Sequence, residues 1–135
     1  MAITFRFTPD DMKMGILVDP TWYTCRVEDV TEAEALDGSK NIFCDLKILD
    51  QPDSKSDFRG VTVRRCFNEK GKGYASSYVL ACGGKLDITK EQEIDFERTK
   101  GKVIKVYIGR RKDKDGSGKQ YNDPSDFRSI PQQVA

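Results

Sequence analysis

Hydrophobic and polar residues alternate with a period of two in four stretches of the chain, a pattern typical of half-buried strands. The first three stretches are residues 21–30, TWYTCRVEDV, residues 41–50, NIFCDLKILD, and residues 58–67, FRGVTVRRCF. The fourth is residues 103–109, VIKVYIG. Residues 121–130, YNDPSDFRSI, alternate more weakly, and Pro124 favours an edge or a bulge because proline cannot donate to a strand ladder. The sequence therefore predicts five strands.

The alternation also predicts which side chains of these strands enter the core. The apolar set expected to face inward is Tyr23, Cys25, Val27, Ile42, Cys44, Leu46, Ile48, Val61, Val63, Ile104, Val106 and Ile108. Strict alternation would carry Arg65 inward as well, and an interior cannot accept a guanidinium without a partner. We therefore expect the third strand to end, curl or bulge near Arg65.

Residues 71–84, GKGYASSYVLACGG, break the alternation. The apolar residues of this stretch recur at helical spacing: Ala75, Tyr78, Val79 and Cys82. Gly83 and Gly84 then provide a stop signal, so we predict a short helix. Residues 93–102, EIDFERTKGK, are expected to add one more helical turn. The predicted order is three strands, a short helix and two strands.

This order of elements is that of the oligonucleotide- and oligosaccharide-binding (OB) barrel, whose helix plugs one end. We predict a mainly β fold: a five-stranded OB-fold barrel with a short helix between strands 3 and 4 and an N-terminal arm. Periodicity does not show closure, so an open antiparallel sheet backed by a helix is the alternative. The predicted divisions are an arm over residues 1–19, a binding domain over 20–131 and a short tail over 132–135. The arm is expected either to remain a mobile tail or to pack on the domain through Phe5, Phe7, Ile16 and Val18.

Composition limits the chemistry that this domain can perform. The 135 residues are 37% apolar and 33% charged and contain no histidine, which removes the commonest general base. The four cysteines lack the close pairs of zinc sites and are expected to be core thiols. No stretch approaches the ~18 apolar residues that cross a bilayer. We expect a protein of the cytoplasm, or of the host cytoplasm if phage-encoded, that is not an enzyme and has no cofactor, metal or membrane partner.

The net charge of +1 hides a segregated distribution of charged residues. Residues 58–72 contain five basic side chains and one acid, and residues 102–121 contain seven basic side chains and two acids. Residues 28–37 contain five acids and no base, and residues 87–97 contain five acids and one base. Such separation can steer a polyanion toward one face of the molecule.

The segments WYTCRVEDV, NIFCDLKILD and FRGVTVRRCF, followed by a short helix and TKGKVIKVYIG, resemble small phage-type single-stranded DNA-binding proteins. The resemblance spans roughly residues 15–130 and lies in the order and spacing of weak motifs. It implies an OB fold that binds single-stranded DNA without strong sequence preference and protects it during phage DNA replication or recombination. The expected partners are single-stranded DNA, replication or recombination proteins and, in a homo-oligomer, further copies of the chain.

Single-strand binding needs a basic groove for the backbone and flat side chains for stacking, which contribute ~1–3 kcal/mol per base. In an OB barrel the second and third strands form the usual face, flanked here by the 109–120 loop, GRRKDKDGSGKQ, as a flexible clamp. The residues expected to contact the DNA backbone are Lys47, Arg59, Arg64, Arg65, Lys105, Arg110, Arg111, Lys112, Lys114 and Lys119. The residues expected to stack on bases are Phe43, Tyr107, Tyr121, Trp22 and Phe67.

Some of these assignments have structural alternatives. The N-terminal arm could cover Phe43, and Phe67 and Trp22 could belong to the core or the barrel rim. The acids of residues 28–37 would repel phosphate beside the groove, so either the DNA enters from the other side or these acids bind another protein. The alternative function is therefore an OB-fold protein-interaction or regulatory module without nucleic-acid binding.

Overall fold

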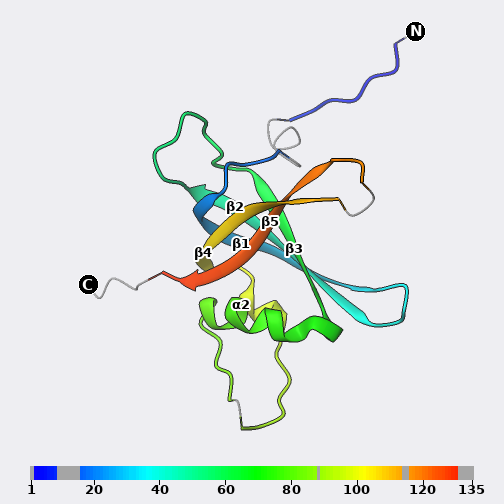
Figure 1. Ribbon diagram of the computed structural model, residues 1–135, viewed down its shortest axis with the longest axis vertical. Helices are drawn as coiled ribbons and strands as arrows, with labels where there is room; N and C mark the ends of the chain where they lie inside the picture. The colour runs from blue at the N-terminus through cyan, green and yellow to red at the C-terminus, as the bar shows by residue number, and fades with distance from the viewer. Residues whose placement is uncertain (1, 9–15, 88, 114–115, 131–135) are drawn as a thin grey trace.

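Five antiparallel strands and three short helical segments form the fold of a computed structural model, which describes residues 2–8, 16–87, 89–113 and 116–130 (Figure 1). The strands are β1 Thr21–Glu34, β2 Lys40–Asp50, β3 Thr62–Asn68, β4 Val103–Lys112 and β5 Gln120–Ser129. The helical segments are η1 Glu69–Ala75, α2 Ser76–Ala81 and η2 Phe96–Thr99. The predicted order of three strands, a helix and two strands is confirmed.

The strands form one sheet in the order β3-β2-β1-β4-β5, so β3 and β5 are its two edges. These edges approach each other through side chains. Arg65 Nη1 of β3 lies 3.6 Å from Asp123 Oδ1 of β5, and the ring centroids of Phe67 and Phe127 are 6.1 Å apart. The predicted five-stranded antiparallel sheet is confirmed, and its closure into a barrel stays a prediction.

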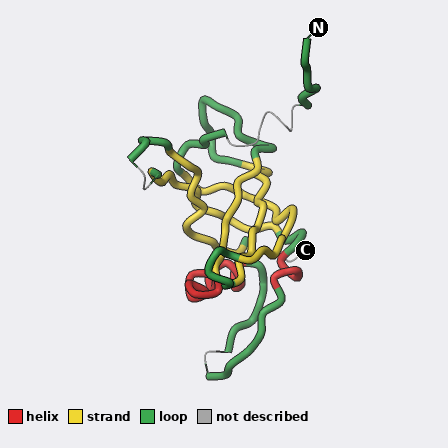
Figure 2. Tube along the Cα trace, turned by 90° about the vertical axis from the view of Figure 1, so that its right-hand side faces the viewer, coloured by secondary structure: helices red, strands yellow, loops and turns green. Residues whose placement is uncertain are grey.

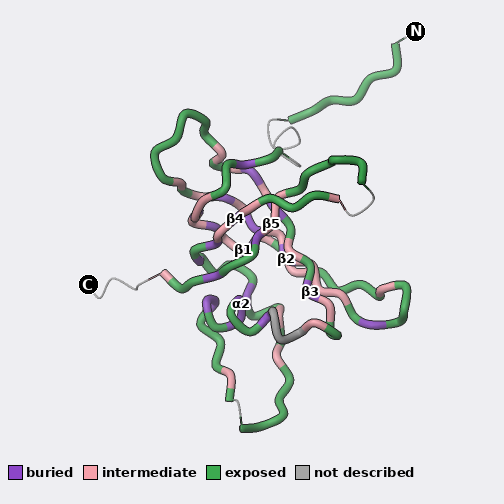
Figure 3. Tube along the Cα trace, in the orientation of Figure 1, coloured by how far each residue is buried: buried purple, intermediate pink, exposed green. Residues whose placement is uncertain are grey.

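The core lies on the inner face of the curled sheet (Figure 3). All but one of the side chains expected to face inward are buried, and Ile42 is partly buried against them. The period-two prediction is thus confirmed in β1, β2 and β4. In β5 the buried residues are Pro124 and Phe127, and a register shift lies beside Pro124, as proline at a bulge predicts.

The helices close one end of the core (Figure 2). Tyr78 of α2 is fully buried, and its hydroxyl donates a 2.8 Å hydrogen bond to Thr99 Oγ1 of η2. A side chain on Gly84 would meet Val79 Cγ1 at 2.6 Å, so only glycine lets the chain leave α2 at this point. The predicted helix and the additional turn are confirmed. Among the described residues, no helix combines the length and apolar character required to cross a bilayer.

Of the three predicted alternatives for β3 near Arg65, an end and a bulge do not occur, and a curl of the strand stays a prediction. The register between β2 and β3 runs without interruption from Asn41 opposite Asn68 to Lys47 opposite Thr62. Arg65 is tolerated because it pairs with Asp123 and lies 5.1 Å over the ring of Phe67. The ion pair between Arg65 of β3 and Asp123 of β5 therefore provides a partner for the guanidinium without an interruption of the strand.

Residues at the end of the N-terminal arm contact the domain. Val18 is buried, and the backbone N–H of Val18 donates a 3.0 Å hydrogen bond to Oδ1 of Asn122 in β5. Phe5 and Phe7 are 86% and 66% exposed, so the expectation that they pack on the domain is wrong. The remaining parts of the predicted arm and tail, residues 1, 9–15 and 131–135, lie outside the described residues.

Cys66 is exposed, which corrects the expectation that all cysteines are core thiols. Burial raises the pKa of Cys25 to about 12 and that of Cys44 to about 11. Because the thiolate is the reactive form, buried thiols that stay protonated react slowly.

We expect one fast thiol in the native protein at about pH 8 in a titration with an aromatic disulfide, and four after denaturation. The fast reaction should disappear in Cys66→Ser, and two fast thiols in the native protein would contradict the model of burial.

Candidate nucleic-acid interface

Aromatic and basic side chains share the outer face of β1, β4 and β5. We call this group the aromatic patch, and its members are Trp22, Lys105, Tyr107, Arg111, Tyr121 and Arg128. Lys105, Tyr107 and Arg111 alternate along β4 and so point to one side. The other three lie directly opposite them on the neighbouring strands: Trp22 opposite Tyr107, Tyr121 opposite Arg111 and Arg128 opposite Lys105. Register therefore brings residues from three strands onto one surface.

Trp22 lies at the centre of the aromatic patch. Its ring meets that of Tyr107 edge to face, with centroids 5.7 Å apart. The guanidinium of Arg128 lies 4.6 Å from the centroid of the Trp22 ring. Trp22 and Tyr107 are both half-buried, and the Arg128 guanidinium lies over the Trp22 ring.

Tyr121 carries cations near its ring at the start of β5. Arg111 lies 5.7 Å and Lys119 5.5 Å from the ring centroid, and the hydroxyl donates to Asp113 Oδ2 at 3.1 Å. These contacts order the side chains at the base of the β4–β5 hairpin. Lys114, also predicted to bind DNA, lies outside the described residues.

Several predicted backbone-binding cations have no ion pair with a carboxylate in the described part of the chain: Lys47, Lys105, Arg111, Lys112 and Lys119. Arg128, which the sequence analysis did not select, also has no ion pair with a carboxylate in the described part of the chain. Lys47 lies on the outer face of the sheet, opposite Arg26 of β1 and Thr62 of β3. A cation without a carboxylate partner can bind a phosphate without first losing an ion pair, so these side chains suit a polyanion best.

The outer face of β2 and β3, which the sequence analysis favoured, is electrostatically compensated. Arg64 forms a two-pronged ion pair with Asp45, at 2.7 Å from Nε and 3.3 Å from Nη2. The hydrogen bond to Asp45 raises the pKa of Arg64. The same guanidinium lies 5.2 Å from the ring centroid of Phe43, which is half-buried and is covered by Arg64 rather than by the N-terminal arm. Asp29, which faces Asp45 on the neighbouring strand, is itself paired with Lys100 at 3.6 Å, so Arg64 and Lys100 are both already bound to carboxylates here.

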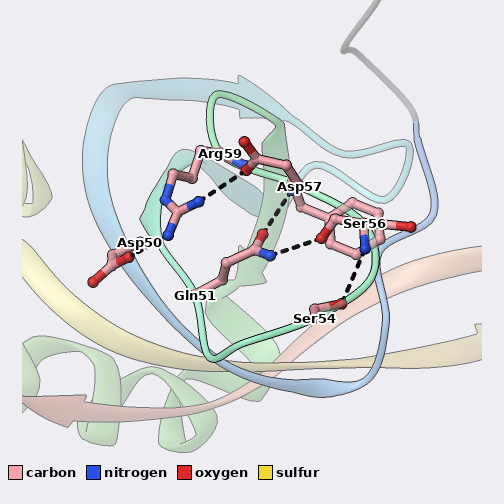
Figure 4. A network of polar contacts seen from close by, with 7 residues as sticks. Asp50, Gln51, Ser54, Ser56, Asp57 and Arg59 are labelled. Atoms are coloured by element: carbon pink, nitrogen blue, oxygen red, sulfur yellow. Dashed lines mark hydrogen bonds and ion pairs between the residues drawn. The ribbon is translucent and has the colours of Figure 1, made fainter.

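Arg59 holds the loop between β2 and β3 (Figure 4). Its guanidinium lies 3.1 Å from Asp50 Oδ1 and 3.3 Å from Asp57 Oδ1. The pKa of Asp50 is lowered by a backbone hydrogen bond from Gln51 and then by Arg59. Gln51 also accepts a 2.6 Å bond from the backbone N–H of Phe58. Arg59 therefore stabilises the loop and is a poor candidate for phosphate binding.

Three other predicted site residues have structural roles, of which the sequence analysis had raised only the core position of Phe67 as an alternative. Arg110 donates two 3.2 Å hydrogen bonds to the carbonyl of Val18 and so holds the chain where it enters β1. Arg65 is paired with Asp123. Phe67 is buried, with 4% of its surface exposed, and cannot stack on a base in this conformation. We withdraw all three from the candidate site.

Arg128 is the residue that sequence reasoning missed. It follows the buried Phe127, which places it on the outer side of β5. Its position over Trp22 depends on the β4–β5 register, and the weak alternation around Pro124 gave no means of reading that register.

The described residues contain no group of three or more side chains able to hold a metal ion. No protein-family model matches the chain, and no curated protein is significantly similar to it. The aromatic patch is therefore interpreted from its own chemistry.

Proposed function

We propose that the chain folds as an OB domain that binds single-stranded DNA without strong sequence preference, protecting it during phage replication or recombination. The strand order supports the OB proposal, because curling a β3-β2-β1-β4-β5 sheet until its edges meet closes a five-stranded barrel. The ion pair between Arg65 and Asp123 already joins those edges.

The aromatic patch is the single observation that carries the binding proposal. Trp22, Tyr107 and Tyr121 offer flat rings for bases, and every base has a face that can stack. Lys105, Arg111 and Arg128 lie among these rings on the same face and can neutralise the backbone phosphates. Stacking combined with unpaired cations is the arrangement that binds a single strand regardless of its sequence.

The charge distribution favours one path for the bound single-stranded DNA across the sheet. The β1–β2 hairpin is acidic, and Glu32, for example, pairs with Lys40 near its tip. The unpaired cations lie instead on β4, on the β4–β5 hairpin and at Lys47. Single-stranded DNA is therefore expected to run from that hairpin over Tyr107 and Trp22 toward Lys47, rather than along β2 and β3.

The second candidate function is a protein-interaction module, and the acidic β1–β2 hairpin favours it. Residues 28–37 hold five acids, most of them exposed, and a basic partner protein could bind there. This function does not use the aromatic patch, so nucleic-acid binding separates the two proposals.

The salt dependence of oligo-dT binding tests the proposed function. We expect log K to fall linearly with log salt, with a slope of about −0.7 per phosphate contact. Lys105→Gln should weaken binding to all sequences alike. It should also reduce the magnitude of the salt slope by the amount that one phosphate contact contributes. The matched control is Lys85→Gln, which changes an exposed lysine in the segment after α2, outside the aromatic patch. An unchanged anisotropy of labelled oligo-dT at low salt would reject the proposal in favour of the interaction module.

A further inference from the structure

The N-terminal arm displays an alternating apolar strip that nothing in the described chain covers. In residues 2–8, AITFRFT, the apolar side chains are 96% exposed at Ile3, 86% at Phe5 and 66% at Phe7. Arg6 lies between the two phenylalanines. Contiguous exposed apolar surface marks interaction sites in soluble proteins, so the arm has the composition of a docking segment.

An apolar pocket lies at the helical end of the domain. Its volume is about 520 Å³, within the range of pockets that enclose a drug-sized ligand, so two phenyl rings fit. The pocket is bounded by the start of β2, the end of β3, α2 and residues 86–96, with apolar walls formed by Ile42, Val79, Leu86 and Ile94. No part of the aromatic patch lines it.

Two carboxylates give the pocket a negative rim. Glu69 and Glu93 both line it, together with Lys40. Lys40 is already paired with Glu32 at 3.0 Å, and Glu93 has no ion pair among the described residues. A segment that combines apolar side chains with one arginine matches the apolar walls and the negative charge of this pocket.

The arm lies at one end of the molecule and α2, whose residues line the pocket, lies at the other end (Figures 1 and 2). The arm leaves beside the 51–59 loop and the β4–β5 hairpin, whereas α2 and the segment after it form the other end. We propose that residues 3–7 of one copy bind in this pocket of a second copy, with Phe5 and Phe7 against the apolar walls and Arg6 beside Glu93. Each copy contributes one arm and one pocket, so the interface joins unlike surfaces.

Sedimentation velocity of the full chain without DNA tests this assembly over roughly micromolar to several hundred micromolar concentrations, where weak protein interfaces dissociate. The weight-average mass should rise with concentration, and Phe5→Ser with Phe7→Ser should weaken association at least about 10-fold. The control Leu36→Ser removes another exposed apolar side chain, from the β1–β2 turn, and should leave the association unchanged. A wild-type chain that stays monomeric, or an assembly unaffected by the double substitution, overturns the proposal.

A charge exchange tests the pairing of Arg6 with Glu93. Arg6→Glu and Glu93→Lys should each weaken self-association several-fold, because each places like charges together. Mixing the two variants should restore association to about the wild-type level, since each arm then meets a pocket of opposite charge. Failure of the mixture to recover would exclude this contact. Because these measurements contain no DNA, their failure is distinct from a failure to bind oligo-dT.

Discussion

Replacing both Trp22 and Tyr107 with leucine is expected to weaken binding of oligo-dT at least about 30-fold, since each base stacked on a ring contributes ~1–3 kcal/mol. Leucine keeps an apolar side chain on the outer face of the sheet but removes the flat ring. The loss should appear in fluorescence anisotropy of labelled oligo-dT at fixed salt. Circular dichroism and the urea midpoint should stay close to wild type, because neither side chain belongs to the core.

Phe43→Leu is the matched control for that double substitution. Phe43 is also a half-buried aromatic residue on the outer face, but it lies beside the Arg64–Asp45 pair. We expect its replacement to change the affinity less than about twofold. A larger loss for Phe43→Leu than for the Trp22 and Tyr107 variant would place the DNA on β2 and β3 and refute the aromatic patch. Because Trp22 is the only tryptophan, its fluorescence also reports binding directly in Tyr107→Leu.

The fold was predictable where one physical rule decides it. Alternation in β1, β2 and β4 identified the buried positions because these strands have one face on the core and one in water. The helix was predictable because Ala75, Tyr78, Val79 and Cys82 recur at helical spacing before two glycines. The length of β1 was not, since its last four residues, 31–34, include only one apolar side chain and are held by pairing with β2.

The site was less predictable because a cation's availability depends on its partners. Arg64 and Lys105 look equivalent in the sequence, but the β2–β3 register places Asp45 opposite Arg64, and Lys105 has Thr24 opposite it in β1. The guanidinium of Arg110 donates a hydrogen bond to the carbonyl of Val18, which lies 92 positions earlier in the chain. Contacts at such separations depend on the tertiary fold, so the sequence identifies the kinds of residue in the candidate site but not which of its cations lack a carboxylate partner.

Phe67 was selected from the sequence for base stacking, with a core position as the alternative, and the structure buries it. Its replacement tests the core role. Its ring centroid lies 5.1 Å from that of Tyr78 and 6.0 Å from that of Phe96. Phe67→Ala is expected to lower the free energy of unfolding by about 3–5 kcal/mol, as a large cavity in the core does. Loss of the ring would also remove the support under Arg65 and so loosen the contact between β3 and β5. Urea denaturation followed by circular dichroism measures the change.

The milder Phe67→Leu variant separates a core role from the stacking role that the sequence predicted. Leucine fills part of the space, so the domain should stay folded, with a smaller loss of stability than in Phe67→Ala. Its affinity for oligo-dT should match wild type, since the aromatic patch lies on the opposite face of the sheet from the buried Phe67. A folded Phe67→Leu protein with a 10-fold weaker affinity would show that the ring reaches the DNA, which would require β3 and β5 to separate when the strand binds.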